Sequence, residues 1–223
     1  MINAVTLLRR KPNLSVDEFQ RHWQTEHASI ITRLPGVQRY VQSHPICDYY
    51  QDRDPVYDGI AELWAEDSQA FRDIAASEVY AEVQTDEKKF LDRAAIALVL
   101  TDEHVIKEGS IARKHVKRIQ LFRRRPKLSV DEFQNYWRDI YGLKFAQLPL
   151  LDRYVQYHAR SGGYAKGRQP AYDGFDVSWF RSADALHHAL NSEGYDRARR
   201  EQANFLVTGE CPQLLAREFV IMD

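Results

Sequence analysis

The sequence holds one group of side chains that could transfer protons, and it holds this group twice. "RYVQSH" spans residues 39–44 and "RYVQYH" spans residues 153–158. In both, a tyrosine, a glutamine and a histidine occupy alternate positions, which in a β-strand point to one face. The members are Tyr40, Gln42 and His44 in the first stretch and Tyr154, Gln156 and His158 in the second. Tyrosine and histidine can serve as acid and base, so both stretches are candidate site segments.

Each polar triplet alternates with apolar residues of the same strand. Val41 and Val155 share parity with Val37 and Leu151, so we expect these apolar residues to lie under helices. The tyrosine, glutamine and histidine are then expected on the opposite face, pointing into the space between two sheets. Buried polar groups there need hydrogen bonds or a ligand. Two interpretations stay open, a ligand site and a hydrogen-bond ladder that fixes strand register.

The triplets belong to a longer internal duplication. Residues 7–45 match residues 121–159 at an offset of 114, and "PVYDGIAELWA" matches "PAYDGFDVSWF" at an offset of 115. The segment 107–114 contains Gly109 and Ser110 and has the composition of a linker. We therefore predict two similar halves, 1–110 and 111–223.

Each half shows the same order of secondary-structure signals. Val5–Arg10 and Ile119–Arg124 are predicted strands, and each is followed by a proline and a capping box. Apolar residues at helical spacing come next, then two strands, a second capped helix and a closing strand. The order βαββαβ predicts a ferredoxin-like unit. The fold class is thus α+β, with the antiparallel sheets of the two units closing into one α+β barrel.

Composition excludes several functional classes. The chain has 223 residues and a net charge of -1, which gives no electrostatic reason to bind nucleic acid. No apolar stretch approaches the roughly 20 residues of a membrane span. Cys47 and Cys211 lie at non-matching positions of the repeat, so a reducing cytoplasm is the expected location. The sequence has no metal-binding, phosphate-binding or dinucleotide-binding motif, and we predict no cofactor and no metal.

The first copy resembles a known family. "RRKPNLSVDEFQRHWQTEHASIITRLPGVQRYVQSH" followed by "YDGIAELW" resembles the EthD family of dimeric α+β barrels, and the second copy repeats the pattern less closely. The resemblance implies a small-molecule enzyme, because members are associated with ether degradation and fungal relatives with dehydration or cyclisation of aromatic polyketides. It also implies that His27 is an active-site residue. Related barrels include cofactor-free isomerases and monooxygenases.

The expected catalytic residues are His27 as the base and Tyr40 or His44 as the donor. The second copy has Tyr141 at the position of His27, and a phenol is a poor base at neutral pH. We therefore expect the first copy to carry the chemistry. The expected substrate-binding residues are Arg10, Gln42, Glu62, Arg124, Tyr141, Tyr154, Gln156 and His158. Glu62 and Asp176 are acids that occur in one half only.

The leading functional hypothesis is a cofactor-independent enzyme of the dehydratase, cyclase or isomerase type. Its substrate would be a small hydrophobic or aromatic oxygenated molecule, and the tandem barrel could form a homodimer. Two other enzyme hypotheses stay open, a cofactor-free monooxygenase or accessory oxidoreductase, and a haem-binding barrel with a histidine ligand. From a different class, the chain could bind a hydrophobic molecule without converting it.

Overall fold

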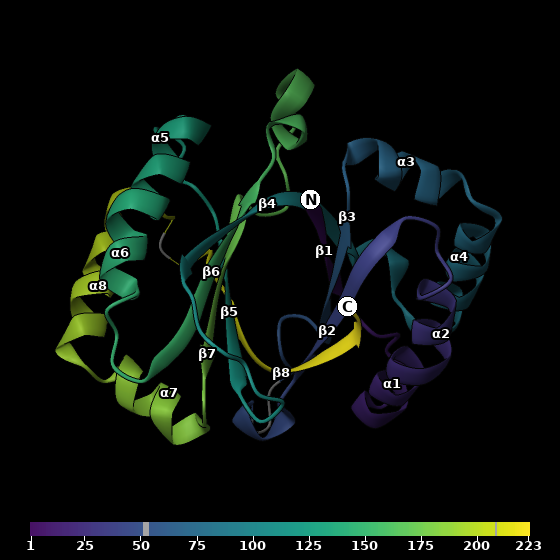
Figure 1. The fold of residues 1–223 in the computed structure, drawn as a ribbon, viewed down its shortest axis with the longest axis horizontal. Helices are drawn as coiled ribbons and strands as arrows, with labels where there is room; N and C mark the ends of the chain where they lie inside the picture. The colour runs from purple at the N-terminus through teal and green to yellow at the C-terminus, as the bar shows by residue number, and fades with distance from the viewer. Residues whose placement is uncertain (51–53, 208) are drawn as a thin grey trace. The chain divides into compact units, whose positions relative to one another are not determined.

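The computed structural model describes residues 1–50, 54–207 and 209–223. The chain divides into two compact units (Figure 1). Unit 1 comprises Met1–Leu100 and Glu218–Asp223, and unit 2 comprises Thr101–Arg217. These bounds differ from halves split at residue 110, because the strands that close the two halves each run through both units.

Unit 1 follows the expected βαββαβ order, with its second helix split in two. Its elements are β1 (Ile2–Leu8), α1 (Val16–His22), a π-helical turn (Trp23–His27), α2 (Ala28–Ile31), β2 (Val37–Pro45), β3 (Gly59–Ala65), α3 (Ser68–Ala76), α4 (Glu78–Phe90) and the start of β4 (Ala97–Lys107), whose residues from Thr101 on belong to unit 2. Short 3₁₀ turns lie at Cys47–Tyr49 and Arg93–Ala95.

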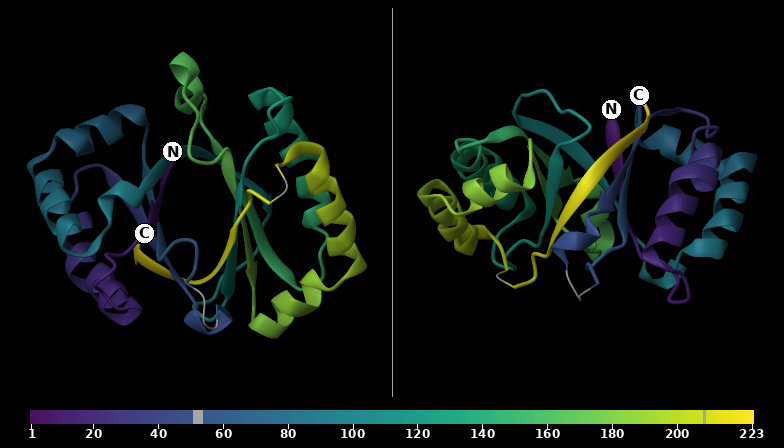
Figure 2. Two further views of the ribbon diagram at one scale, coloured as in Figure 1. Left: turned by 180° about the vertical axis from the view of Figure 1, so that it is seen from behind. Right: turned by 90° about the horizontal axis from the view of Figure 1, so that it is seen from below.

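Unit 2 repeats the same order. Its elements are β5 (Val116–Phe122), α5 (Val130–Tyr136), a π-helical turn (Trp137–Gly142), α6 (Leu143–Phe145), β6 (Leu151–Ala159), a 3₁₀ segment (Ser161–Gly167), β7 (Gly174–Phe180), α7 (Ala183–Leu190), α8 (Glu193–Phe205) and the start of β8 (Gln213–Met222), whose residues from Glu218 on belong to unit 1. In both units the helices lie on one side of the strands (Figures 1 and 2).

The strands hydrogen-bond in the order β1-β3-β2-β8-β5-β7-β6-β4, and this order closes on itself as a barrel. β3 is paired antiparallel with β1 and β2 in unit 1, and β7 is paired antiparallel with β5 and β6 in unit 2. The α+β class, the tandem ferredoxin-like units and the closed sheet are confirmed.

Local sequence explains where the helices begin. Ser15 accepts from the backbone N–H of Glu18, and Glu18 reaches back to the N–H of Ser15 at 2.9 Å. Ser129 and Glu132 form the same capping box in unit 2. Such boxes satisfy backbone donors that a helix start leaves unpaired. Both predicted capping boxes are therefore confirmed.

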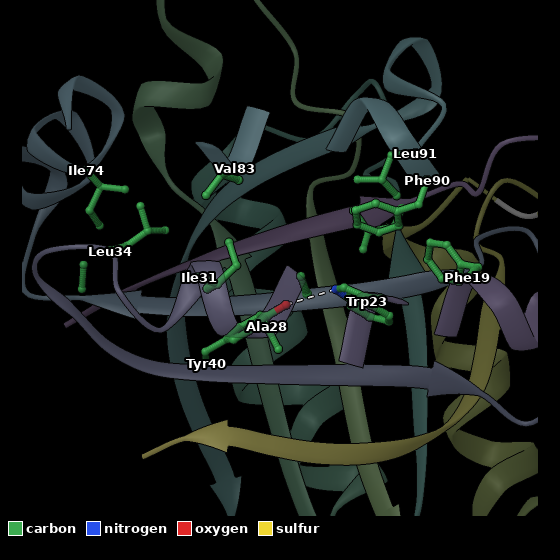
Figure 3. Packing of buried hydrophobic residues seen from close by; sticks show 13 residues of the cluster. Phe19, Trp23, Ala28, Ile31, Leu34, Tyr40, Ile74, Val83, Phe90 and Leu91 are labelled. Atoms are coloured by element: carbon green, nitrogen blue, oxygen red, sulfur yellow. Dashed lines mark hydrogen bonds between the residues drawn. The ribbon is translucent and has the colours of Figure 1, made fainter. Parts of the chain in front are cut away.

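Between the helices and the sheet, the core of unit 1 contains Phe19, Trp23, Ile31, Tyr40 and Phe90, as Figure 3 shows. Gly59 permits this packing. A Cβ at Gly59 would lie 2.4 Å from Cζ3 of Trp23, so the indole ring needs a glycine beneath it. Gly174 has the same relation to Trp137 in unit 2.

The polar triplets point toward the helices, and the expectation that they face away from them is wrong. Tyr40 belongs to the helix-side core and pairs across the sheet with Leu63, whereas Val41 pairs with Glu62 on the opposite face. The reason is a register shift between Val37 and Arg39, which adds a residue and reverses the alternation that follows. An equivalent shift between Leu151 and Arg153 precedes the second triplet.

Candidate functional site

A π-helical turn presents His27 to the core of unit 1. The turn spans Trp23–His27 and interrupts an otherwise continuous helix between α1 and α2. Single π-turns inside helices occur frequently at functional sites. Unit 2 has the same feature at Trp137–Gly142, which presents Tyr141. Both side chains are buried, and the His27 side chain keeps 7% of its surface exposed, whereas Tyr141 is fully buried.

His27 forms a hydrogen bond with a buried carboxylate on α4. Its Nδ1 lies 3.0 Å from Oδ2 of Asp86, and its ring packs edge-on against Phe90. A carboxylate accepts hydrogen bonds, so Nδ1 carries the proton and Nε2 carries the lone pair. Burial lowers the pKa of His27, although the hydrogen bond and charge of Asp86 oppose this shift. At neutral pH the imidazole is therefore uncharged, in the form a general base requires.

Asp86 is held by three donors. His22 Nε2 lies 3.0 Å from Oδ2, and Lys89 Nζ lies 3.1 Å from Oδ1. Burial disfavours the carboxylate, but hydrogen bonds from Lys89, His22 and His27 outweigh this cost and lower the pKa of Asp86. The ionised carboxylate can therefore orient His27 and stabilise a proton that the imidazole accepts.

The triplet of β2 forms a chain of hydrogen bonds that ends at Tyr40. His44 Nε2 lies 2.9 Å from Gln42 Oε1, and Gln42 Nε2 donates to the Tyr40 hydroxyl at 2.7 Å. Trp23 Nε1 also donates to this hydroxyl, at 3.1 Å (Figure 3). The oxygen of Tyr40 is thus a double acceptor. No contact within the described residues uses its own proton.

His44 is placed by stacking and kept neutral by burial. Its ring stacks on Trp23 with centroids 4.4 Å apart and meets Phe219 of β8 at 4.7 Å. Burial lowers the pKa of His44 to about 4. Since Gln42 Oε1 is an acceptor, His44 Nε2 carries the proton. We interpret His44 as the residue that orients Gln42, and through it Tyr40.

Burial also raises the pKa of Tyr40, so its phenol stays protonated at neutral pH. A protonated phenol whose oxygen already accepts twice can still donate to a third group. Two residues on the same helix-facing side of the sheet, Thr6 and Leu63, are partly exposed. Ala61 lies on this side as well. Solvent therefore reaches the side of the sheet on which Tyr40 lies.

Unit 2 uses the equivalent positions differently. The Tyr154 hydroxyl donates to Asp176 Oδ1, and the Tyr141 hydroxyl lies 3.5 Å from Asp176 Oδ2. Arg118 Nη1 lies 3.6 Å from the same carboxylate. Burial raises the pKa of Asp176 to about 6 despite the charge of Arg118. The Tyr154 proton is thus engaged inside the protein, whereas that of Tyr40 is not.

The remaining triplet residues of unit 2 copy those of unit 1. Gln156 Nε2 donates to Trp137 O at 3.0 Å and to the Tyr154 hydroxyl at 2.9 Å. His158 Nε2 lies 2.9 Å from Gln156 Oε1, and its ring stacks on Trp137 at 4.2 Å. Desolvation lowers the pKa of His158 to about 2, with nearby positive charge adding to the shift.

Three other expected site residues lie away from these groups. The Arg10 guanidinium pairs with Asp58 and donates to Leu14 O at 3.1 Å. The Arg124 guanidinium pairs with Asp173 at 3.3 Å. Each guanidinium thus joins the end of a strand to nearby loops. Glu62 lies on the sheet face turned away from the helices, where Ser43 Oγ donates to it at 3.2 Å. The structure does not bring these three together with His27.

Two charged residues beside the candidate site groups were not expected from the sequence. In unit 1, Asp86 forms the hydrogen bond to His27. In unit 2, Arg118 lies beside the carboxylate of Asp176. The repeat held a signal for Asp86, because Glu201 is an acid at the matching position, 115 residues later. Glu201 accepts from Tyr136, which matches His22, at 2.5 Å. Arg118 has Ala4 as its counterpart, so the first copy of the repeat carries no matching charge.

Over the described part of the chain, no cluster of three or more histidine, cysteine or acidic side chains could hold a metal ion. Among the same residues, no helix is long and apolar enough to cross a membrane.

The fold and the paired polar triplets define a tandem α+β barrel protein of two ferredoxin-like units. The chain belongs to the EthD family, because the EthD domain matches residues 11–94 and again residues 125–209. The family resemblance seen in the sequence is confirmed. None of the curated proteins matches the chain.

Solved structures share the fold at low sequence identity. An anthrone oxidase-like protein is 13% identical with a TM-score of 0.71, covering 100% of this chain and 94% of its own. A candidate monooxygenase from Lactobacillus acidophilus is 9% identical with a TM-score of 0.58, covering 97% and 93%. A mutant chlorite dismutase from Candidatus Nitrospira defluvii is 5% identical with a TM-score of 0.51, covering 96% and 90%. These likenesses show the fold alone.

Proposed function

We propose that unit 1 is a cofactor-independent acid–base catalyst acting on a small apolar or aromatic molecule that carries oxygen. The observation that supports this most is the His27–Asp86 pair, in which a neutral imidazole has its Nδ1 held by an ionised carboxylate. This arrangement leaves Nε2 to take a proton. The surroundings are Phe90, Trp23 and Ile31, which suit an apolar substrate.

Tyr40 supplies the complementary acid function in this proposal. Its hydroxyl accepts from Trp23 and Gln42, and its proton points to neither. It would donate a hydrogen bond to a carbonyl oxygen of the substrate while His27 removes a proton from a carbon conjugated with that carbonyl, either the adjacent carbon or one linked to it through an aromatic ring. The developing enolate is stabilised by that hydrogen bond. Enolisation of this kind initiates dehydration, cyclisation and isomerisation.

A second candidate function shares the first step. An enolate or phenolate can react directly with dioxygen, and two structural neighbours are described as an anthrone oxidase-like protein and a candidate monooxygenase. Proton removal by His27 would then precede oxidation. The two functions differ in whether dioxygen is consumed.

The test uses anthrone, a neutral aromatic ketone with an acidic methylene group, at pH 7.5 in D₂O. Deuterium incorporation is followed by mass spectrometry in the absence of dioxygen, and oxygen uptake is followed with an electrode in air. We expect exchange faster than the uncatalysed rate, and loss of this excess in His27→Ala. Uptake of dioxygen above the enzyme-free control would favour the oxidative function. Exchange that is equal with and without His27 would exclude this histidine as the base.

Non-catalytic binding is the remaining alternative. It requires an apolar site but no proton acceptor, so a His27→Ala variant would retain ligand affinity and no ligand would be converted. Persistent binding of anthrone with neither deuterium exchange nor oxygen uptake in the wild-type protein would support this reading against both enzymatic proposals for that compound.

A further inference from the structure

Side chains of unit 2 occupy the region between its helices and its sheet. Arg118 and Asp176 lie on the helix-facing side of β5 and β7, and both are fully buried. The guanidinium of Arg118 lies 5.6 Å from the ring centre of Phe145 and donates to Gln120 Oε1 at 2.5 Å. Asp176 meets the hydroxyls of both tyrosines, as described above. This region of unit 2 is therefore filled by the protein itself.

The same positions in unit 1 carry smaller side chains. The internal repeat matches Arg118 with Ala4, Asp176 with Ala61, Phe145 with Ile31 and Tyr141 with His27. The four residues of unit 2 have no exposed surface, whereas their counterparts in unit 1 retain 4% to 6%. Thr6 and Leu63 are partly exposed, but the matching Gln120 and Ser178 are buried. Unit 1 thus lacks the groups that close this region in unit 2.

We propose that the chain has one ligand site, on the helix-facing side of the sheet of unit 1, and that Asp176 of unit 2 stands where a ligand oxygen lies in unit 1. This inference rests on the proposed function for the location of the site, and adds its stoichiometry and its ligand class. The carboxylate of Asp176 contacts Tyr154 and Tyr141, whose counterparts are Tyr40 and His27. A ligand oxygen beside Ala61 would meet the same two positions.

The charges of unit 2 indicate which ligand unit 1 prefers. The negative charge of Asp176 is compensated by Arg118, 3.6 Å away. Unit 1 has Ala4 at the position of Arg118, and the partly buried acid Glu87 at the position of Gln202. An anion in unit 1 would therefore lack the cation that Arg118 provides in unit 2, which is costly. The site should take a neutral molecule with an oxygen that accepts a hydrogen bond from Tyr40.

Three probes of matched size test the proposal: 2-naphthol, 2-naphthoate and naphthalene. Binding at pH 7.5 is measured by titration calorimetry and by quenching of tryptophan fluorescence, since Trp23 contacts Tyr40. We expect one 2-naphthol per chain and at least tenfold weaker binding of 2-naphthoate. Tyr40→Phe should weaken 2-naphthol roughly fivefold and leave naphthalene unchanged, because only the hydrogen bond is removed.

Two further variants locate the site. Ala61→Leu fills the region with a neutral side chain and should weaken 2-naphthol at least tenfold. Asp176→Asn keeps unit 2 filled and should leave both affinity and stoichiometry unchanged. Thermal melts verify that each variant is folded, and Ala61→Val provides a smaller change if Ala61→Leu does not fold.

Four results would overturn the proposal: two bound probes per chain, unchanged binding in the folded Ala61 variants, tighter binding of 2-naphthoate, or no binding of any probe at millimolar concentration. The result is separable from the proposed catalysis. His27→Ala should abolish deuterium exchange while the variant still binds one naphthalene per chain, because an apolar probe makes no hydrogen bond to His27, so a failed catalytic test leaves the binding test intact.

Discussion

His27 Nδ1 lies 3.0 Å from Asp86 Oδ2, although the two are 59 positions apart in the chain. The contact joins a π-helical turn to α4, which packs against it, and it fixes both the tautomer and the orientation of the imidazole. Unit 2 has Tyr141 and Glu201 at the matching positions, and Glu201 instead bonds Tyr136 and Lys144. At these two positions, therefore, unit 1 has a histidine–carboxylate pair and unit 2 does not.

We expect Asp86→Asn to reduce turnover of a unit 1 substrate by about 10- to 100-fold, and His27→Ala by about 100- to 10,000-fold. The asparagine is nearly isosteric but cannot stabilise an imidazolium by charge. The measurement is steady-state kinetics. Glu201→Gln is the matched control, since it changes the equivalent acid of unit 2 and should leave kcat within a factor of about two. Equal losses for Asp86→Asn and Glu201→Gln would show that the change acts through general stability.

The pH dependence of kcat/KM should show an acidic limb set by His27. Burial holds the pKa of His27 below its ordinary value of 6.5, and the base must be neutral, so the rate should rise as pH increases through that lowered pKa and then level off. Asp86 contributes a hydrogen bond and a charge that raise the pKa of His27. Asp86→Asn should therefore move the limb to still lower pH. A limb that shifts upward in this variant would contradict the assignment.

Tyr40→Phe and Tyr154→Phe should have opposite consequences. In unit 1 the change removes a donor available to substrate, so we expect turnover to fall by about 10- to 100-fold with a small loss of stability. In unit 2 it leaves buried Asp176 without one of its hydrogen bonds, so we expect about 1–3 kcal/mol of destabilisation and little kinetic change. Kinetics and urea unfolding of both variants test this. Parallel effects in the two assays would rule out the asymmetric assignment.

Acid should destabilise the fold through His44 and His158. The pKa of His44 is about 4 and that of His158 about 2 in the folded protein, both below the unfolded value near 6.5. Their stabilising contributions are present above pH 6.5 and are lost as pH falls, because the unfolded chain binds the proton first. For His44 this amounts to about 2 kcal/mol between pH 7 and pH 5.

Urea unfolding at pH 7 and pH 5 measures this effect. Replacing either histidine by asparagine should reduce the loss of stability on acidification, and the double variant should reduce it further. Activity separates the two positions, since His44→Asn should disturb Gln42 and Tyr40 and lower turnover more than His158→Asn does. An unchanged acid sensitivity in both variants would mean that other groups govern it.

The sequence by itself determined the repeat, the order of elements and the helix starts. These features are local or depend on spacing alone: the capping boxes at Ser15 and Ser129 act within four residues, and the offset of 114 carries one half onto the other. The family resemblance singled out His27 in the same way, from a run of residues around it. Tyr40, Gln42 and His44 were found because the motif recurs.

Only the tertiary structure decided what those residues face. A register shift near Val37 turned Tyr40 toward the helices, and no alternation pattern records such an inserted residue. The partner of His27 is likewise settled by packing, since α4 brings Asp86 beside the π-helical turn. The sequence shows Ala61 and Asp176 at matching positions of the repeat. Only the structure shows that Tyr154 and Arg118 contact the carboxylate of Asp176. Spacing fixes which side chains share a strand, and packing fixes which groups they contact.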